Sequence, residues 1–373
     1  MSAIAKVEAR TVSIPLEAAT SFSNRRVTER QYSLVRVTTE DGAQGVGFCY
    51  AGHKGGAIIS LAVRELLAPV VVGEDAHRVT GLWQQMYHES ILHGRVGSVM
   101  RGISAVDIAI WDRNARAADL PLWRYLGGVS EGSVPAYASG GYYLDGKEPS
   151  DLAREMRGYV DLGFKAVKLK VGGASAVADG ERIGAVRDEV GPDVLVMLDA
   201  NNAWDDVPSA LHALDVWAEH DVFWIEEPFS PDDIGSHARL ARATDILVAT
   251  GEIEAGRWRH KELLDQEAAA ILQTDAAVCG GVTEWRRIAA TADSYGVPMY
   301  PHWFHDLHVQ LVAATPNAKC VEFFVDDKVL NFRKLIDRQL EFANGELSLP
   351  TEPGLGFAWD DAAVDEYAID DWG

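Results

Sequence analysis

Cysteine is scarce in this sequence, and the few cysteines form no pattern. Only Cys49, Cys279 and Cys320 occur in 373 residues, and they are odd in number, far apart and surrounded by apolar residues. This arrangement excludes a disulfide framework and a zinc-binding cysteine motif. It favours a reducing compartment, so we expect a cytoplasmic protein.

Long hydrophobic runs are absent as well. Nowhere does the chain contain an uninterrupted apolar stretch of about 20 residues, the length that a membrane-spanning helix needs. Residues 1–18 carry charges every few positions and lack the apolar centre of a secretion signal. The sequence therefore predicts a soluble protein that is not exported.

Positive charge is in short supply. The chain has 34 Lys and Arg against 56 Asp and Glu, a formal net charge of −22. This charge would repel nucleic-acid phosphates and anionic lipids, and no run of Lys or Arg interrupts the acidic background. We therefore expect neither nucleic acid nor membrane as a partner. An anionic substrate would have to be attracted locally, by a metal ion and a few basic side chains.

What the chain does contain, from Val134 onward, is a regular alternation of β-rich apolar runs with amphipathic helical patterns. The runs begin near residues 134, 166, 194, 222, 246, 270, 297 and 319. Their spacing is the span of one strand and one helix, and eight such units close into a parallel barrel. The last unit has room for only a short helix within 328–341, so we predict an α/β fold with a modified (β/α)7β TIM-type barrel.

The first 128 residues have a different pattern. Residues 1–50 suggest an antiparallel meander with a turn at 40–42, and helical stretches follow over 75–93 and from about 99 to 118. The tail is rich in Gly, Pro and Asp and does not continue the barrel. We predict an N-terminal α+β capping domain at 1–128, a catalytic barrel at 129–345, and a tail, 346–373, that packs back on the first domain.

Three acidic residues each lie where a predicted barrel strand ends and a loop begins. Asp199, Glu226 and Glu252 are 27 and 26 residues apart, so parallel strands would bring them to one end of the barrel. Carboxylate oxygens suit Mg²⁺ or Mn²⁺ better than zinc. Strand periodicity sends Glu226 and Glu227 to opposite sides, and parity leaves open which of them holds the metal.

Two lysines share a face of the second barrel strand. Lys168 and Lys170 are two positions apart, and the apolar residues between and beside them suit the layer against the helices. Both lysines should therefore point into the barrel, where two close, partly desolvated ammonium groups lower each other's pKa. Such a lysine is a usable base near neutral pH. The alternative is a pair of lysines at an exposed strand edge.

An aspartate and a histidine end the sixth and seventh runs. Asp275 and His302 would lie on neighbouring strands, where the carboxylate fixes the tautomer of the imidazole and raises its basicity. His305 and His308 compete for this role. Because they are three residues apart on what looks like the following helix, we interpret them as structural.

Two further polar residues share this end of the predicted barrel. Asn201 follows Asp199 by two residues and so lies on the same face, where its amide could hold a substrate hydroxyl. Glu322 ends the eighth run and would meet the same pocket. Either residue could instead support a neighbouring group.

Taken together, these motifs resemble those of the enolase superfamily, and more narrowly its mandelate racemase subgroup. In strand order they are KLK, DAN, EEP, GE, Asp275, His302 and Glu322. The resemblance extends to the helix at 104–128 and the tail at 353–357. It implies that Asp199, Glu226 and Glu252 bind one Mg²⁺ per subunit, with Mn²⁺ as a substitute.

The resemblance also implies roles for the remaining residues. Lys170 would be one acid/base residue and His302, supported by Asp275, the opposing one, while Lys168 would polarise the substrate carboxylate. The residues that would contact substrate are Asn201 and Glu322. A symmetric homo-oligomer, a dimer or an octamer, is implied as well.

At two positions this chain differs from other subgroups of the superfamily. Lactonising and dipeptide-epimerising relatives carry a second lysine on the sixth strand, where this chain has Gln273-Thr274-Asp275. Glucarate dehydratase relatives tend to replace the third acidic ligand with an amide, whereas Glu252 is acidic. Both differences disfavour those activities.

The chemistry implied by the resemblance is removal of the proton α to a carboxylate, through an enediolate. Return of a proton to the opposite face would racemise or epimerise the α-centre. Protonation and loss of a β-hydroxyl would instead give a 2-keto-3-deoxy acid. The groups that face the rest of the substrate decide between the two outcomes.

Two segments of the first domain are candidate lids over this site. Residues 21–30 are strongly polar, and residues 50–56 combine basic side chains with mobile glycines. The candidate substrate contacts are Arg25, His53 and Lys54, although these charges could simply be solvated. Polar lids favour a polyhydroxylated aldonic or aldaric acid.

We therefore predict a lyase of carbohydrate catabolism, a hydro-lyase that dehydrates a sugar acid. A racemase or epimerase of a 2-hydroxy acid is the first alternative. A non-catalytic barrel that binds a sugar acid or acts as a scaffold is the second.

Overall fold

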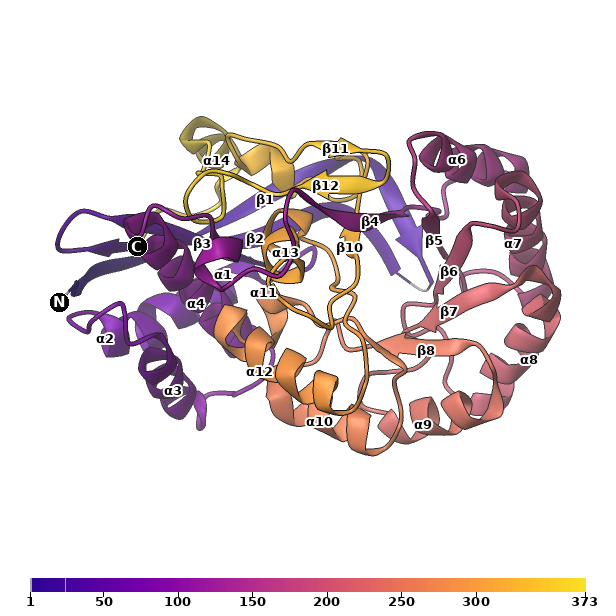
Figure 1. The fold of residues 1–373 in the computed structure, drawn as a ribbon, viewed down its shortest axis with the longest axis horizontal. Coiled ribbons are helices and arrows are strands. Elements are labelled where there is room, and N and C mark those ends of the chain that lie inside the picture. Colours follow the sequence, from indigo (N-terminus) through magenta and orange to yellow (C-terminus); the bar gives the residue numbers. More distant parts are fainter. Residues whose placement is uncertain (1, 24) are drawn as a thin grey trace.

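The fold is a barrel joined to a smaller part that contains an antiparallel sheet. The computed structural model describes residues 2–23 and 25–373, so Asn24 of the candidate lid 21–30 lies outside the described residues. Figure 1 shows the N-terminal strands and helices on one side and the barrel, with its helices outside, on the other. The C-terminal helix returns to the N-terminal strands.

The N-terminal part is a three-stranded meander followed by helices. Its antiparallel strands, in spatial order, are β1 (Ile4–Phe22), β2 (Arg25–Thr39) and β3 (Gln44–Tyr50). Its helices are α1 (Gly56–Ala62), a π-helical turn η1 (Val63–Leu67), α2 (Ala68–Val71), α3 (Val79–Ser90), α4 (Ser98–Ala117) and α5 (Leu122–Tyr125). The predicted meander and both predicted helices are present.

Helix α4 lies directly on strand β3, and two glycines permit this approach. A Cβ atom built at Gly45 would lie 2.1 Å from the Ala109 carbonyl oxygen, and one at Gly47 would lie 1.9 Å from that of Ala105. Any side chain at these two positions would push the helix away from the sheet. The close contact fixes α4, which extends toward the site described below.

The barrel strands follow one another around the ring. They are β4 (Ser133–Ser139), β5 (Ala166–Lys170), β6 (Leu195–Asp199), β7 (Val222–Glu226), β8 (Leu247–Thr250), β9 (Ile271–Leu272) and β10 (Val321–Phe323). Neighbours from β4 to β9 pair in parallel, and β10 pairs with β4. The predicted α/β barrel is therefore confirmed.

The run predicted to begin at Val297 is not a regular strand. Only Met299 bridges its neighbours there, to Leu272 on one side and Ala318 on the other. Pro298 and Pro301 flank this stretch, and proline has no N–H to donate to a strand ladder. Single bridges thus replace a strand between β9 and β10.

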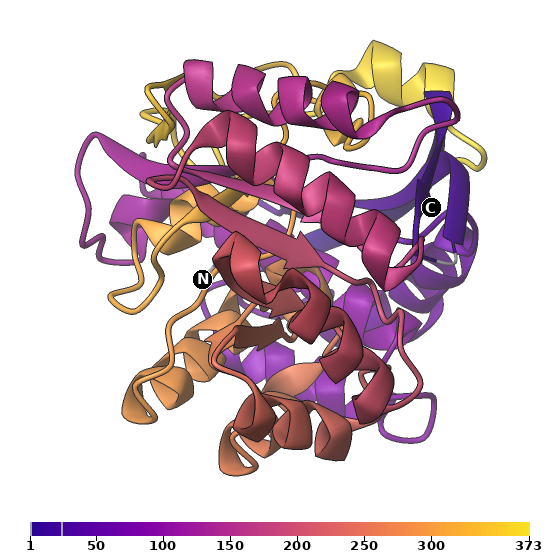
Figure 2. The same cartoon turned by 90° about the vertical axis from the view of Figure 1, so that its right-hand side faces the viewer.

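Helices cover the outside of the barrel, as Figure 2 shows for those drawn from magenta to red. They are α6 (Pro149–Asp161), α7 (Ala176–Val190), α8 (Val207–Trp217), η2 (Ala218–His220), α9 (Ile234–Ala243), α10 (Gly256–Asp265), α11 (Ala276–Cys279), α12 (Gly281–Ser294) and α13 (His305–Val312). Side chains cap several of them; Asp206, for example, accepts the Ser209 N–H at the start of α8. In residues 2–23 and 25–373 no helix is both long and apolar enough to cross a membrane.

The chain after β10 forms only short elements. The 3₁₀ turn η3 (Phe332–Leu335) is the short final helix expected within 328–341. Strands β11 (Phe342–Ala343) and β12 (Glu346–Ser348) then extend the barrel sheet, because β12 pairs with β4. Helix α14 (Asp361–Tyr367) precedes a tail that hydrogen-bonds β1, through Ile369 to Thr11 and Gly373 to Ala9. The domain boundaries at 128 and 345 stay a prediction.

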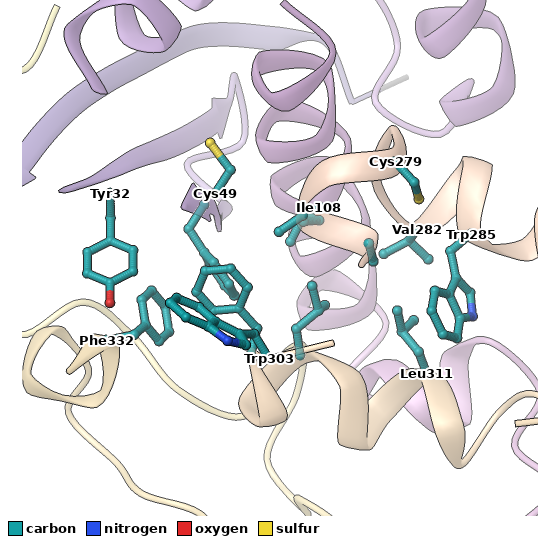
Figure 3. Packing of buried hydrophobic residues seen from close by; sticks show 14 of the residues in the cluster. Tyr32, Cys49, Ile108, Cys279, Val282, Trp285, Trp303, Leu311 and Phe332 are labelled. Atoms are coloured by element: carbon teal, nitrogen blue, oxygen red, sulfur yellow. The ribbon is translucent and has the colours of Figure 1, made fainter. Parts of the chain in front are cut away.

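Aromatic and aliphatic side chains fill the space between the N-terminal part and the barrel. Figure 3 shows Tyr32, Ile108, Trp285, Trp303 and Phe332 in this buried layer. They come from β2, α4, α12, the loop before α13 and η3. The layer fixes the N-terminal part over the end of the barrel, which sets the position of the lids.

One buried carboxylate also joins the two parts. Asp107 of α4 accepts the backbone N–H of Thr283 at 2.9 Å and its hydroxyl at 2.6 Å. Gly281 packs so closely that a Cβ there would lie 2.4 Å from an Asp107 oxygen. Burial raises the pKa of Asp107 to about 7, although the two Thr283 hydrogen bonds oppose this effect.

This pKa predicts a pH dependence of stability. An unfolded Asp has a pKa of about 3.9, so the folded protein binds more protons between that pH and about 7. The contribution of Asp107 to the free energy of unfolding therefore falls as the pH rises through this window. Asp107→Asn should gain about 2 kcal/mol relative to the wild type between pH 5 and pH 8. Urea unfolding at both values measures this gain; Asp361→Asn, an exposed control, should show none, and equal differences at both pH values would contradict the prediction.

Candidate active site

A cavity of about 710 Å³ lies between the N-terminal part and the carboxyl ends of the barrel strands. The barrel residues that line it are Tyr142, Lys170, Asn201, Glu252, Ile253, Asp275, Val278, His302 and Trp303. Lys168, Asp199, Glu226 and Glu322 are buried within the barrel and do not form its wall. This location is where barrel enzymes carry their active sites.

The backbone is strained where it leaves the barrel strands. Asn201 and Glu227 have φ values of 43°, Trp303 has 54° and Phe304 has 28°. Non-glycine residues rarely adopt this left-handed conformation, which costs on the order of 1–3 kcal/mol each and concentrates at functional sites. The strain marks the ends of the third, fourth and seventh barrel units.

Both lysines of β5 point into the barrel, as predicted. Lys168 is 1% exposed, and its Nζ lies 2.7 Å from Glu226 Oε1 and 2.8 Å from Glu322 Oε1. Lys170 is 4% exposed and forms an ion pair with Asp199. Each ammonium group is therefore bound by carboxylates.

Lys168 does lower the pKa of Lys170, as expected, but the predicted net result, a lysine with a depressed pKa, is wrong for this arrangement. Burial does lower the pKa of Lys168, but attraction by Glu226 and Glu322 outweighs it, and the pKa lies well above its ordinary value. Burial likewise lowers the pKa of Lys170, but the surrounding acidic groups, Asp199 foremost, together outweigh it, and the pKa lies above its ordinary value. The carboxylates were not counted in the sequence argument, which considered only the two cations.

The carboxylates outnumber the lysines at this end of the barrel. Asp199, Glu226, Glu252 and Glu322 are buried beside only two lysines. Burial, together with the charge of Asp199, raises the pKa of Glu226 to about 7. Glu252 is affected most: its pKa lies well above the ordinary value, and its Oε2 is buried without a hydrogen-bond partner among the described residues. The cluster carries surplus negative charge, which a bound cation would offset.

Both lysines contact carboxylates of this cluster directly. Within the described chain, no three His, Cys, Asp or Glu side chains are arranged to hold a metal ion. Lys168 contacts both oxygens of Glu226, at 2.7 and 2.8 Å, and Lys170 contacts Asp199.

The strand-parity argument does not apply at Glu227, because this residue does not continue the strand. Its φ of 43° breaks the alternation of a strand. Burial raises the pKa of Glu227 to about 8, and the charges of Asp199 and Glu226 add to the effect. Both adjacent glutamates therefore contribute to the local negative charge, and Glu226 is the one bound by Lys168.

The predicted pair of Asp275 and His302 is formed. His302 Nδ1 lies 3.1 Å from Asp275 Oδ2, and its Nε2 lies 3.4 Å from Glu252 Oε1. The imidazole stacks on Trp303 with ring centres 5.2 Å apart. With Nδ1 held by the carboxylate, Nε2 is the nitrogen available for proton transfer.

The two neighbouring histidines have buried structural contacts. His308 Nδ1 donates to the Trp303 carbonyl at 2.9 Å, and its Nε2 accepts the Ala276 N–H at 3.1 Å. His305 Nε2 accepts from Arg333, and burial holds the pKa of His305 well below its ordinary value. Neither lines the cavity.

Asn201 and Glu322 occupy different positions relative to the cavity. The Asn201 backbone N–H donates to Asp199 Oδ1 at 2.9 Å, and its side-chain Oδ1, buried and without a partner among the described residues, belongs to a residue of the cavity wall. Glu322 lies beneath, where it accepts the Trp303 N–H at 2.8 Å. Although burial opposes it, the charge of Lys168 lowers the pKa of Glu322 to about 2. Glu322 thus positions Lys168.

The lid residues line the opposite side of the cavity. Arg25, His53 and Lys54 all belong to its wall and are exposed. Arg25 also donates to Asn202 Oδ1 at 3.0 Å, which ties the lid to the barrel. Phe22 and Val27 line the cavity as well, so the lid is less uniformly polar than the sequence suggested.

Sequence reasoning did not single out several cavity residues, two of them, Arg30 and Tyr50, within the lid segments themselves. Arg30 of β2, Tyr50 of β3 and Arg101 of α4 line the wall, together with Trp303. Arg101 had one visible signal, its place in the first turn of a predicted helix. Only the packing of α4 on β3 shows that this turn faces the cavity.

Comparisons with known proteins cover both parts of the chain. Residues 4–127 match the N-terminal domain of the mandelate racemase / muconate lactonizing enzyme family, and residues 151–363 match the enolase C-terminal domain-like family. Arabinonate dehydratase of Saccharolobus solfataricus is 34% identical over 343 residues, 89% of each chain. L-talarate/galactarate dehydratase of Salmonella typhimurium is 32% identical over 354 residues, 94% of this chain and 86% of that one.

Solved structures agree with these matches. A racemase from Streptomyces coelicolor A3(2) with bound magnesium has a TM-score of 0.92 at 30% identity and covers 98% of this chain and 100% of its own. An L-talarate dehydratase from Polaromonas sp. JS666, complexed with Mg and L-glucarate, has a TM-score of 0.91 at 31% identity, with 100% and 99% covered. With the lysine pair, the carboxylates and the Asp–His pair at the ends of its barrel strands, this chain belongs to the mandelate racemase / muconate lactonizing enzyme family of the enolase superfamily.

Proposed function

We propose that the protein is a Mg²⁺-dependent dehydratase of a sugar acid. It removes the proton α to a carboxylate and expels the β-hydroxyl, giving a 2-keto-3-deoxy acid. The observation that carries this proposal is the meeting of Lys170 and the His302–Asp275 pair in one cavity wall beside Glu252. Relatives named arabinonate, L-talarate/galactarate and L-rhamnonate dehydratases support it.

Asp199, Glu226 and Glu252 are the residues we propose as holders of one Mg²⁺, for which Mn²⁺ could substitute. The surplus negative charge of the cluster and the partnerless Glu252 Oε2 fit a divalent cation with oxygen ligands. When bound, the cation supplies positive charge that offsets the charge developing on the substrate carboxylate.

The chain's own residues move the protons. One of Lys170 Nζ and His302 Nε2 takes the α-proton, and the other delivers a proton to the departing hydroxyl. Asp275 holds His302 in the tautomer with Nε2 free. Lys168 supplies positive charge toward the substrate carboxylate, and Asn201 offers Oδ1 to a substrate hydroxyl.

A panel of aldonic and aldaric acids, incubated with enzyme and Mg²⁺ and assayed with a keto-acid reagent, tests the proposal. Keto product is expected from at least one acid. Exchange of an α-proton in D₂O without any keto product would replace the proposal by a racemase or epimerase, which the pair of acid/base groups also permits. Unchanged activity of the Lys170→Ala, His302→Ala double variant would remove the site from the mechanism.

Metal removal gives a separate prediction. Dialysis against EDTA should abolish keto-acid formation, and added Mg²⁺ should restore it, because four buried carboxylates are then again offset by a cation. Calorimetric titration of Mg²⁺ into the stripped protein should show binding that Glu252→Gln weakens. No metal binding at all would favour a non-catalytic sugar-acid-binding or scaffold barrel.

The setting of the enzyme belongs to the same proposal. We place it in the cytoplasm, because the three cysteines are free and two of them are buried. We place it in carbohydrate catabolism because relatives are named as dehydratases of sugar acids. We also propose a symmetric homo-oligomer, a dimer or an octamer, which light scattering would measure.

A further inference from the structure

The lid side of the cavity is rich in positive charge that nothing balances. The basic residues that line it are Arg25, Arg26, Arg30, Lys54 and Arg101. Of the described residues, the only carboxylates in the cavity wall are Glu252 and Asp275, and both come from the barrel. In a chain with 56 acidic residues, this separation of charge indicates an anionic ligand group on the lid side.

Two of these arginines come from rigid elements and are held by the same tyrosine. Arg30 Nη1 donates to the Tyr50 hydroxyl at 2.8 Å, and Arg101 Nη1 donates to the Tyr50 carbonyl at 2.7 Å. The Arg30 guanidinium also lies 4.4 Å from the centre of the Trp303 ring, next to His302. Strand β2 and helix α4 carry the two arginines, and Arg30 Nε also donates to the Val329 carbonyl in the loop after β10.

Neither arginine has a counter-charge. In residues 2–23 and 25–373, no Asp or Glu forms an ion pair with Arg30 or Arg101. Arg30 is 1% exposed, and its Nη2 has no hydrogen-bond partner in the described chain. Buried charges in proteins are normally paired, because an uncompensated one is costly. By contrast Arg113, equally buried, pairs with Asp41 at 2.7 Å.

We propose that the substrate carries a second carboxylate, which Arg101 binds on the lid side of the cavity, while Arg30 acts through Tyr50 as a positioning residue. This inference rests on the proposed function and narrows its substrate class from sugar acids in general to dicarboxylic, aldaric acids. One carboxylate faces Lys168 and the metal ligands, and the other faces Arg101. A cavity of about 710 Å³ is within the usual range for a ligand of this size. The relatives' names include both mono- and dicarboxylic acids, so the choice rests on the two arginines.

The test compares matched pairs of hexaric and hexonic acids that differ only in the terminal carboxylate. The wild type should prefer the diacid of a pair, and Arg101→Met should lower kcat/KM for it by about 100-fold, chiefly through KM. The kcat/KM of this variant for the monoacid should fall by less than about 3-fold. Arg101→Lys should restore part of the preference. Because both acids are assayed in one preparation, the ratio does not depend on how much of the variant folds.

Arg116→Met is the matched control on the same helix. Arg116 pairs with Asp112 at 2.8 Å outside the cavity, so its loss should leave the diacid/monoacid ratio unchanged. An equal fall for both acids in Arg101→Met, or a wild type without preference for the diacid, would overturn the inference.

Failure of the proposed function would show separately, as an absence of keto product from every acid. Calorimetric titration of the Mg²⁺-loaded protein with the same pairs would then decide the inference. Tighter binding of a diacid than of its matched monoacid, lost in Arg101→Met, supports it. Equal affinities, or no binding of any diacid, overturn it.

Discussion

Lys170→Met should lower the rate of keto-acid formation by about 10²- to 10⁴-fold, the range typical for loss of a general acid or base. Lys170 is the only lysine of β5 in the described cavity wall, and this residue, 4% exposed, forms an ion pair with Asp199. Methionine keeps most of the volume and removes the proton carrier. Steady-state assays with the best acid of the panel measure the loss as a fall in kcat.

The control is Lys334→Met, because Lys334 pairs with Asp327 at 3.4 Å outside the cavity. It should keep kcat within about 3-fold of the wild type. A Lys170→Met variant that unfolds like the wild type and retains its kcat would exclude Lys170 from proton transfer.

Asp275→Asn should produce a loss of the same order, about 10²- to 10⁴-fold in kcat, although Asp275 does not itself exchange a proton. The carboxylate accepts from His302 Nδ1 at 3.1 Å and so leaves Nε2 free toward the cavity. An amide can donate to Nδ1 instead, which stabilises the tautomer with the proton on Nε2. His302→Asn should lower kcat by at least the same factor.

His305→Asn is the control for this pair, since His305 is buried on the next helix and does not line the cavity. Its unfolding free energy should fall while kcat per folded molecule changes little. Asp275→Asn with wild-type kcat would show that the hydrogen bond to His302 has no role in the reaction.

Isotope exchange then separates the roles of the two acid/base residues. In D₂O, the variant that lacks the base should lose both α-proton exchange and keto product. The variant that lacks the acid should keep exchange and lose only the product. Lys170→Met and His302→Asn should therefore differ in exchange while both fail to dehydrate.

Much of the barrel was predictable because strand and helix periodicities are local. The ends of the runs at Asp199, Glu226, Glu252 and Asp275 coincide with the ends of β6, β7, β8 and β9 to within a few residues. The motif order also led to the correct superfamily. The prediction of a regular seventh strand was wrong. Two prolines there have no N–H to donate to a neighbouring strand, and an apolar sequence pattern does not reveal this loss.

Electrostatics could not be predicted in the same way, because a pKa depends on every charge nearby in space. The two lysines of β5 were expected to lower each other's pKa, but Glu226, Glu322 and Asp199 raise both. Strand parity also did not apply at Glu227, where a left-handed backbone conformation breaks the alternation of a strand.

By itself, the sequence determined the barrel and the order of its chemical groups, because these follow from local periodicity and from residues at strand ends. The class of reaction came from the resemblance of these motifs to the enolase superfamily. Only the tertiary structure decided which side chains face these groups from the lid side of the cavity. It brings Arg30 and Arg101, 71 residues apart, onto Tyr50 without a counter-charge. No local sequence pattern predicts where these arginines lie, because their placement arises from the packing of α4 against β3. Two glycines of β3 allow the helix to approach.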